Sequence, residues 1–340
     1  GNPTVFNTKQ VDFDGTDDYM QISPLGLTGT FTYSFWYKGD GNPDFLAGDS
    51  ATDTKIGFVN SKYFIRLNVT GDNTIALGTL DWNHLVVTRD SSNKVDLYVN
   101  GGSANRLYSD VAQNSTVNLD YIGKTNSGQN YDGQLSQAGV WNSTLTADEV
   151  SSLYNHGLPI DLTTDQAAYK SSSNLVGYWR MGSGTLDSYP LIADQTNATL
   201  GSELVVNGDF ATDSDWTLGT GATISNNLLN FDNVNNDETR QLNLFPTPSL
   251  GAYEVSFDIS NYVGGHIDLY LGGYQRFDFN ANSNGTWKQT CVISNPSSNN
   301  IFYFIGDNFT GSIDNVSVKQ VNGNPAIMTN MTASDIENGS

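Results

Sequence analysis

Short runs in which apolar and polar residues alternate occupy most of the chain. In the segment 253–260 the odd-numbered residues are Tyr, Val, Phe and Ile, and the even-numbered ones are Glu, Ser or Asp. The same alternation recurs in 95–100 and 267–271. A period of two with one apolar face is typical of an antiparallel sheet that buries one side and exposes the other. Because Gly, Asn, Asp and Ser separate the runs, the pattern predicts sandwiches of short strands.

The apolar run 313–318 breaks this alternation. Ile313 and Val316 cannot lie on the same face of a regular strand, because their positions differ by three, an odd number. One extra residue would restore the phase. We therefore expect a β-bulge around Asp314 and Asn315.

One segment, 146–157, has the signals of a helix. Thr146 can cap the first turn, Glu149 completes a capping box, and Gly157 can end the helix in a left-handed conformation. Helix signals are scarce elsewhere, whereas strand signals are frequent. We therefore expect an all-β fold: two antiparallel β-sandwich (jelly-roll) domains with one short helix.

The length of the chain predicts two domains. A chain of 340 residues is about twice the size of a typical domain. Residues 182–202 contain few apolar anchors, and a new strand-rich unit starts at Glu203. We expect the following division: a first sandwich over 1–182 with its core in 5–157 and a return segment at 174–182, a linker over 183–202, a second sandwich over 203–321, and a polar tail or joint to a further module over 322–340.

The charge balance narrows the choice of partners. There are 36 acidic residues against 15 basic ones, a formal net charge of −21. Such a surface repels phosphate backbones, so nucleic acid is not an expected partner, whereas divalent cations are attracted. A protein from a saline extracellular setting has this composition with or without bound calcium, and both interpretations stay open. No run approaches the ~18 apolar residues of a membrane span, so we expect no membrane insertion.

The first half of the chain carries the motifs of a known lectin family. They are Val11–Tyr19 (VDFDGTDDY), Phe31–Tyr37 (FTYSFWY), Trp82–Arg89, Val95–Gly101 and Tyr131–Asn142. In this order and spacing they resemble the laminin-G/pentraxin-like branch of the concanavalin A-like lectin fold, over residues 5–157. The resemblance implies a β-sandwich lectin domain. The segment Leu175–Gly182 is similar to a further strand of such domains.

The second half resembles another sugar-binding fold. Its motifs are Val206–Phe210 followed by Trp216, then Tyr253–Ile259, Gly285–Lys288 and Phe309–Val318. Their order resembles the jelly-roll carbohydrate-binding modules of families four, nine and twenty-two, over 203–321. The pairing of two such modules, in an acidic Asn- and Thr-rich style, is similar to structural proteins of marine tailed phages. The resemblances imply a sugar-binding protein that is secreted or borne on a virion.

Three aspartates mark a candidate calcium site in the first domain. Asp14, Asp17 and Asp18 lie in one tight turn around Gly15. Calcium takes about six to eight oxygen ligands, and clustered carboxylates on a turn supply them. Lectins of the superfamily that the motifs resemble often bind calcium at loop ends, which makes Asp132 a further candidate ligand. Aspartates also cap turns, so a purely structural role stays open.

The second domain has its own candidate calcium ligands. The modules that it resembles hold a structural calcium between the opening segment and the aspartate of the last strand. Asp314 matches that aspartate, and Asp209 lies in the opening segment. The glutamate expected in the opening segment falls at Ala211, so Asp209, Asp237 or Glu238 would have to substitute for it.

The solvent-facing side of the second sandwich is a candidate glycan site. Sugar sites use aromatic rings as platforms, and use amides and carboxylates to bind hydroxyl groups. Strand alternation and the Gly272–Gly273 loop bring such residues toward one shallow cleft: Asp258, Asp268, Tyr270, Tyr274, Gln275 and Arg276. An ordinary polar sheet face with a scattered tyrosine fits the same pattern, and this alternative stays open.

Catalytic motifs are not evident, so we do not expect an enzyme. A glycosidase needs two carboxylates across one cleft, and the few glutamates form no recognisable pair. His84 and His156 occur in a strand motif and at a helix end, and no Ser–His–Asp or Cys–His set has a recognisable motif. Cys291 lies in an apolar strand and is expected in the core.

These observations predict a non-catalytic carbohydrate-binding adhesin, or an appendage or decoration subunit of a phage virion. It would be extracellular or on the virion surface, and it would bind glycans or cell-surface polysaccharide. Other virion proteins and further copies of the chain are additional candidate partners. A purely structural fibre or capsid-decoration protein without glycan binding is the alternative, and a polysaccharide-degrading enzyme is a second one.

Overall fold

The computed structural model describes residues 7–39, 44–51, 53–67, 71–76, 81–103, 105–106, 114–242, 244, 251–272, 275–293 and 301–339. Within these ranges the sheets are antiparallel and α1 (Ala147–Tyr154) is the one α-helix, which confirms the predicted all-β fold class. The chain divides into two compact units: unit 1 is Gly1–Ala198 together with Gly323–Ser340, and unit 2 is Thr199–Asn322. No helix in the described ranges has the length and apolar character needed to cross a bilayer.

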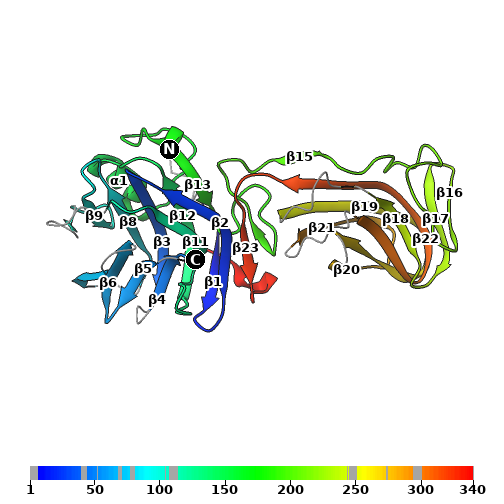
Figure 1. The fold of residues 1–340 in the computed structure, drawn as a ribbon, viewed down its shortest axis with the longest axis horizontal. Helices are drawn as coiled ribbons and strands as arrows, with labels where there is room; N and C mark the ends of the chain where they lie inside the picture. The colour runs from blue at the N-terminus through cyan, green and yellow to red at the C-terminus, as the bar shows by residue number, and fades with distance from the viewer. Residues whose placement is uncertain are drawn as a thin grey trace. The chain divides into compact units, whose positions relative to one another are not determined.

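Unit 1 consists of two sheets around an apolar core (Figure 1). Sheet A has the strand order β10 (Asn105–Arg106), β9 (Val95–Val99), β8 (Asn83–Arg89), β3 (Phe31–Gly39), β12 (Asp132–Trp141), β1 (Lys9–Asp14) and β24 (Ile336–Asn338), with β13 (Leu175–Trp179) also paired to β12. Sheet B has the order β14 (Leu191–Ile192), β23 (Ala326–Thr329), β2 (Tyr19–Leu27), β11 (Val117–Ile122), β4 (Asp44–Gly48), β5 (Thr54–Val59), β6 (Lys62–Leu67) and β7 (Gly71–Ala76). The core between them includes Phe13, Phe35, Ile65 and Leu119.

Helix α1 packs on sheet A through a second apolar cluster, in which Val150 and Leu153 join Val86 and Trp141. These two strand residues do not belong to the core between the sheets, so the helix covers the outer side of sheet A. An isolated helix of eight residues is marginal in water, so this amphipathic helix depends for its stability on the burial of its apolar face.

The two ends of α1 test the predicted capping signals. At the N-terminus the capping box is confirmed: the Glu149 backbone N–H donates to the Thr146 hydroxyl, and the Thr146 backbone N–H donates to the Glu149 carboxylate. The prediction that Gly157 ends the helix is wrong. Asn155 already adopts the left-handed conformation at φ 41° and forms the C-cap, because asparagine tolerates this region better than most residues.

The C-terminal segment belongs to unit 1 and is not the expected polar tail over 322–340. Strand β23 pairs with β2 and β14, and β24 pairs with β1. Ala326, Met328 and Met331 lie in the unit 1 core. The expected linker over 183–202 contributes β14, so unit 2 is an insertion into unit 1. The sequence pattern did not show this because β14, β23 and β24 are short.

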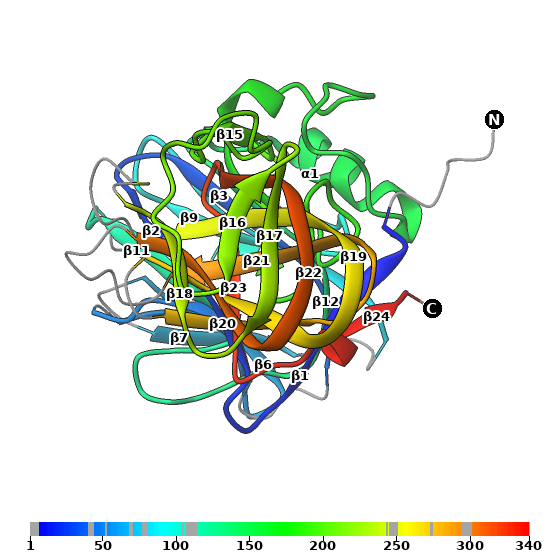
Figure 2. The same ribbon diagram turned by 90° about the vertical axis from the view of Figure 1, so that its right-hand side faces the viewer.

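Unit 2 is built on two long strands, β19 (Gly251–Leu271) and β22 (Ile301–Val321), which lie side by side (Figure 2). The first half of β19 also pairs with β21 (Gly285–Ile293), and its second half pairs with β20 (Gln275–Ala281). Strand β22 also pairs with β15 (Leu200–Glu203), β17 (Leu228–Val234) and β18 (Glu238–Leu242), and β16 (Ala222–Ser225) pairs with β17.

The two halves of these strands enclose one core. Register shifts between Ser260 and His266 separate the halves of β19. Across the core, the ring of Phe257 in the first half of β19 lies 5.3 Å from that of Phe304 in the first half of β22. Cys291 is buried in the same core, as predicted. A jelly-roll core therefore forms from only a few strands because each long strand serves both layers.

The predicted bulge in β22 is confirmed. Asp258 of β19 pairs with Asp314, whereas Ser256 pairs with Ser317, so β22 contains one extra residue between these pairs. Asn315 takes up the irregularity with a φ of 52°. Ile313 and Val316 are consequently both buried, as the apolar pattern requires.

Candidate functional site

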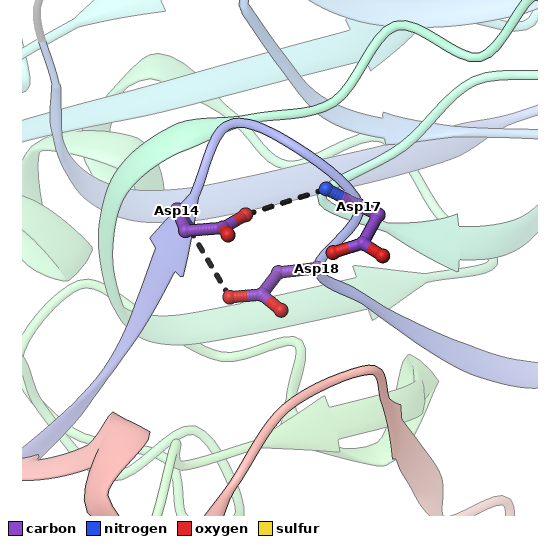
Figure 3. Close-up of side chains that lie close together, drawn as sticks. All are labelled: Asp14, Asp17 and Asp18. Atoms are coloured by element: carbon purple, nitrogen blue, oxygen red, sulfur yellow. Dashed lines mark hydrogen bonds between the residues drawn. The ribbon is translucent and has the colours of Figure 1, made fainter.

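Asp14, Asp17 and Asp18 form the acidic loop that joins β1 to β2. One carboxylate oxygen of each lies within 4.8 Å of those of the other two (Figure 3). Asp14 and Asp17 are exposed, and Asp18 is buried. The turn needs Gly15, which has a φ of 71°, because a Cβ there would lie 2.8 Å from that of Asp132. The sequence therefore predicted the grouping of these three aspartates correctly.

Hydrogen bonds within the acidic loop hold its shape. The Asp14 carboxylate accepts from the backbone N–H of Thr16 at 2.8 Å and of Asp17 at 3.3 Å. The Asp18 carboxylate accepts from the Asp14 N–H at 3.2 Å. The Gly15 N–H donates to the Tyr131 carbonyl at 3.0 Å. These bonds are the turn-capping role left open by the sequence, and they leave further carboxylate oxygens without such a bond among the described contacts.

The surroundings shift the pKa values of Asp14 and Asp18 in opposite directions. Burial raises the pKa of Asp18 to about 6, and the charges of Asp14, Asp335 and Asp17 act in the same direction. The backbone N–H of Thr16 lowers the pKa of Asp14. Repulsion among close carboxylates is relieved by protonation or by a cation, and three carboxylates offer the oxygen donors that calcium prefers.

Asp132 does not join the acidic loop as a ligand. It pairs with Asp14 in the ladder between β1 and β12, but the carboxylates that meet within 4.8 Å do not include its own. Its contribution is steric, because its side chain packs against Gly15.

The candidate ligands of unit 2 do not converge. The Asp209 carboxylate accepts from the Ala211 N–H at 3.4 Å, and that of Asp314 accepts from the Asn315 N–H at 2.7 Å. In the part of the chain that the structure describes, neither residue belongs to a group of three metal-ligating side chains. Asp237, named as a substitute ligand, caps a turn by accepting from the Thr220 N–H at 2.7 Å.

The sheet formed by the second half of β19 with its neighbours carries the candidate glycan residues. Ile267, Leu269 and Leu271 point into the core, so the alternate positions Asp268 and Tyr270 are on the other face. Tyr270 pairs with Arg276 of β20 on one side and with Tyr303 of β22 on the other. We call Asp268, Tyr270, Arg276 and Asp278 the arginine face.

Arg276 is held between two carboxylates of the arginine face. Its Nη2 lies 2.7 Å from an Asp268 oxygen, and its Nε lies 2.7 Å from an Asp278 oxygen. The Arg276 side chain is 49% exposed, and that of Asp278 is 66% exposed. The hydrogen bond that the Arg276 guanidinium donates to the Asp268 carboxylate raises the pKa of Arg276. A fixed guanidinium at the surface is suited to binding oxygen atoms of a ligand.

Asp268 lies on the predicted face but not in solvent. It is 1% exposed, because Arg276 and His266 lie over it and the Asn280 N–H donates to it at 2.7 Å. The expectation that it contacts a ligand is therefore wrong, since a buried, fully bonded carboxylate cannot reach one. Asp268 instead holds the guanidinium of Arg276 in position.

The other predicted cleft residues have different positions. Asp258 lies in the first half of β19, where its carboxylate accepts from Thr286 and from Asn315. Gln275 donates from its side-chain amide to the Val292 carbonyl at 2.7 Å. Tyr274 lies outside the described residues. The predicted cleft is thus reduced to the neighbourhood of Tyr270 and Arg276.

Sequence reasoning missed Tyr303, whose ring stacks on that of Tyr270. The centroids are 4.5 Å apart and the planes differ by 10°. No local motif signals the stack of Tyr303 on Tyr270, because it depends on the register between β19 and β22. Strand alternation places Asp278 on the same face of β20 as Arg276, and the structure adds that the two side chains form an ion pair.

A buried pair of carboxylates near sheet B was also missed. Asp49 and Asp120 are 2% and 4% exposed. The Ser50 backbone N–H donates to Asp120 at 2.7 Å, and the Ser50 hydroxyl donates to it as well. Burial raises the pKa of Asp120, and the charge of Asp49 acts in the same direction. The two aspartates are distant in sequence, so no spacing rule could have paired them.

These features define a class: a two-unit β-sandwich protein with an acidic loop on one unit and a polar aromatic face on the other. Residues 14–151 match the family model described as the concanavalin A-like lectin/glucanases superfamily. A concanavalin A-like lectin or laminin G domain therefore lies within unit 1, as the motifs of the first half predicted. No curated protein matches the chain.

Solved structures show likenesses at low identity. A heptameric SAP-like pentraxin from Limulus polyphemus is 17% identical, covering 44% of this chain and 82% of that one, with a TM-score of 0.37. A putative carbohydrate binding protein from Bacteroides ovatus is 18% identical, covering 56% of each chain, with a TM-score of 0.42. Domain 4 of AbnA, an extracellular arabinanase from Geobacillus stearothermophilus, is 16% identical, covering 42% and 75%, with a TM-score of 0.34. Such values carry no information about ligand or activity.

Proposed function

We propose that the chain is a non-catalytic carbohydrate-binding protein whose glycan site is the arginine face of unit 2. The observation that carries this proposal is the position of Arg276, fixed between Asp268 and Asp278 beside the ring of Tyr270. Sugars present hydroxyl groups at their edges and C–H groups on their faces. A guanidinium with a neighbouring carboxylate serves the hydroxyls, and a tyrosine ring serves the C–H face.

Preorganisation supports this proposal. Ordering a free arginine side chain costs about 1–2 kcal/mol, and here the ion pairs with Asp268 and Asp278 have already ordered it. The stack on Tyr303 likewise fixes Tyr270. Exposed Asp278 remains available as an acceptor for sugar hydroxyls.

The absence of catalysis is part of the proposal. Ser34 and His84 approach at 2.8 Å, as a nucleophile and its base would, but both are buried. Burial lowers the pKa of His84 to about 3, and its ring stacks on that of Trp36 and lies nearly parallel to that of Tyr154, the last residue of α1. A substrate cannot reach this pair, so its role is packing.

The setting and the metal belong to the proposal as well. We place the protein outside the cell or on a virion surface, where it binds glycans as an adhesin or decoration subunit. The acidic loop is proposed to bind calcium through Asp14, Asp17 and Asp18, which supports the shape of unit 1 and takes no part in chemistry. Contacts with other virion proteins or further copies would add avidity.

A polysaccharide array tests the glycan proposal. The wild-type protein should bind at least one glycan, and Tyr270→Ala and Arg276→Ala should each weaken that binding by about tenfold or more, the value of one charged hydrogen bond or stacking contact. Lys288→Ala is a matched control, because the exposed Lys288 pairs with the half-buried Glu254 on the other half of unit 2. A protein that binds no glycan would support a purely structural subunit, and release of reducing ends would support an enzyme.

A further inference from the structure

The outer side of sheet B carries a corner of two tyrosines and a lysine, which we call the Tyr19–Tyr121–Lys124 corner. The rings of Tyr19 and Tyr121 meet edge to face, with centroids 5.4 Å apart and planes at 81°. The Lys124 ammonium nitrogen lies 3.9 Å from the centroid of the Tyr19 ring and 5.4 Å from that of Tyr121. Cation–π attraction of this kind holds the ammonium in place.

Strand alternation places the corner toward solvent. Met20 and Ile22 of β2 point into the core, so Tyr19 and Gln21 lie on the other face, and Gln21 pairs with Tyr121 of β11. Both tyrosines are half-buried and Gln21 is exposed. The corner therefore combines a ring face, an amide and an ammonium at one accessible place.

The backbone of Lys124 is anchored. Gly123 donates to the Leu46 carbonyl at 2.8 Å, and Lys124 forms a bridge with Asn130. The backbone contacts fix the main chain of Lys124, and the two tyrosine rings fix its ammonium group.

Lys124 differs from two other cations on this sheet, Lys55 and Arg66. Lys55 and Arg66 both pair with Asp53, at 3.4 Å and 2.5 Å. Among the described residues no carboxylate lies at ion-pair distance from the Lys124 ammonium, although acidic residues outnumber basic ones by 36 to 15. The partners of this ammonium within the described ranges are the two tyrosine rings, so its three N–H donors retain the capacity to bind an anion.

We propose that the Tyr19–Tyr121–Lys124 corner is a second ligand site, specific for sugars that carry one carboxylate. The carboxylate would pair with Lys124, the C–H face of the sugar would stack on the exposed part of Tyr121, and Gln21 would bind a hydroxyl. The site lies in unit 1 and does not rest on the arginine face of unit 2. The net charge of −21 opposes long polyanions, which favours an isolated acidic sugar within a neutral glycan.

Titrations of the full chain with pairs of ligands that differ only in charge test the proposal. Galacturonate is compared with its methyl ester, and N-acetylneuraminate with its methyl ester, so that uronic and sialic acids are distinguished. The readout is the NMR signals of the tyrosine rings. Signals of Tyr19 and Tyr121 should shift with at least one free acid, and the matching ester should bind about tenfold more weakly. Shifts confined to Tyr270 would report the other site and would contradict this one.

Variants of the lysine complete the test. Lys124→Met keeps the aliphatic chain and removes the charge, so binding should weaken about tenfold or more, whereas Lys124→Arg should retain it. Lys62→Met, an exposed lysine on β6 of the same sheet, is the matched control and should bind as the wild type does. Equal binding of acid and ester by the wild-type protein, which needs no variant, or unchanged binding by a folded Lys124→Met protein, would overturn the proposal.

Discussion

Thr199 and Asn322, where the chain enters and leaves unit 2, are joined by two hydrogen bonds. The Asn322 backbone N–H donates to the Thr199 carbonyl at 2.9 Å, and its side-chain amide donates to the Thr199 hydroxyl at 3.0 Å. Next to this pair, a Cβ on Gly323 would lie 3.3 Å from the Asn197 carbonyl oxygen, so the two chain segments of unit 1 are neighbours. Unit 2 is therefore inserted at one narrow place.

This relationship predicts opposite outcomes for two deletions. Removing 199–322 and joining Ala198 to Gly323 through a short Gly-Ser turn should leave unit 1 folded. Ending the chain at Asn322 removes the buried Met328 and Met331 together with β23 and β24, and should lower the free energy of unfolding of unit 1 by roughly 3–6 kcal/mol. Urea denaturation measures both. Equal stability of the two products would contradict the insertion.

The acidic loop makes stability depend on pH. The pKa of Asp18 rises from 3.8 to about 6 in the folded protein. The folded state then binds more protons than the unfolded state in this range, so its stability falls as the pH rises from about 4 to about 6. Asp18→Asn removes this loss and keeps an oxygen to accept from the Asp14 N–H. Without divalent cations, the variant should be more stable than the wild type by roughly 1–3 kcal/mol at pH 7 and equally stable near pH 4.

A thermal scan at both pH values checks this prediction. A difference between variant and wild type that stays the same at pH 4 and pH 7 would mean that Asp18 does not titrate as described.

Calcium should stabilise unit 1 through the same loop. At a concentration of 100 times the Kd, a ligand that binds only the folded state adds about 2.7 kcal/mol, and Tm rises accordingly. Asp14→Asn combined with Asp17→Asn should abolish the rise. Asp209→Asn combined with Asp314→Asn is the matched control and should preserve it, because these residues do not converge. If calcium leaves the Tm of the wild-type protein unchanged, the proposed calcium site in the acidic loop is contradicted.

The two carboxylates that hold Arg276 should differ in their energetic effects. Asp268 is buried and Asp278 is exposed. Asp268→Asn places a neutral amide against a guanidinium in a buried position and should cost about 1–3 kcal/mol. Asp278→Asn breaks an exposed pair and should cost at most about 1 kcal/mol. Chemical denaturation of unit 2 compares them, and equal costs would show that Asp268 does not support Arg276.

The sequence predicted those features of the fold that depend on a few neighbouring residues. The alternation in 253–260 specifies which side of β19 is buried, and the phase slip between Ile313 and Val316 specifies the bulge. Asp14, Asp17 and Asp18 were predicted together because five residues of one turn contain them. Each of these features is decided by chain geometry over a few residues.

Contacts between distant segments could not be predicted in the same way. The stack of Tyr270 on Tyr303 and the burial of Asp268 beneath Arg276 depend on strand register, which the alternation does not specify. The return of 323–339 to unit 1 depends on strands of three and four residues, whose patterns are too short to be distinctive. Alternation showed the correct face for Asp268, but it could not show which longer side chain covers it.

The binding isotherm of the most strongly bound polysaccharide, measured by calorimetry for the wild type and for Arg276→Ala, tests the central claim most directly. The account predicts a saturable isotherm for the wild type and an affinity about tenfold lower or worse for the variant, with unit 2 still folded. The same affinity for both proteins would contradict it, because the guanidinium held by Asp268 and Asp278 would then have no part in glycan binding.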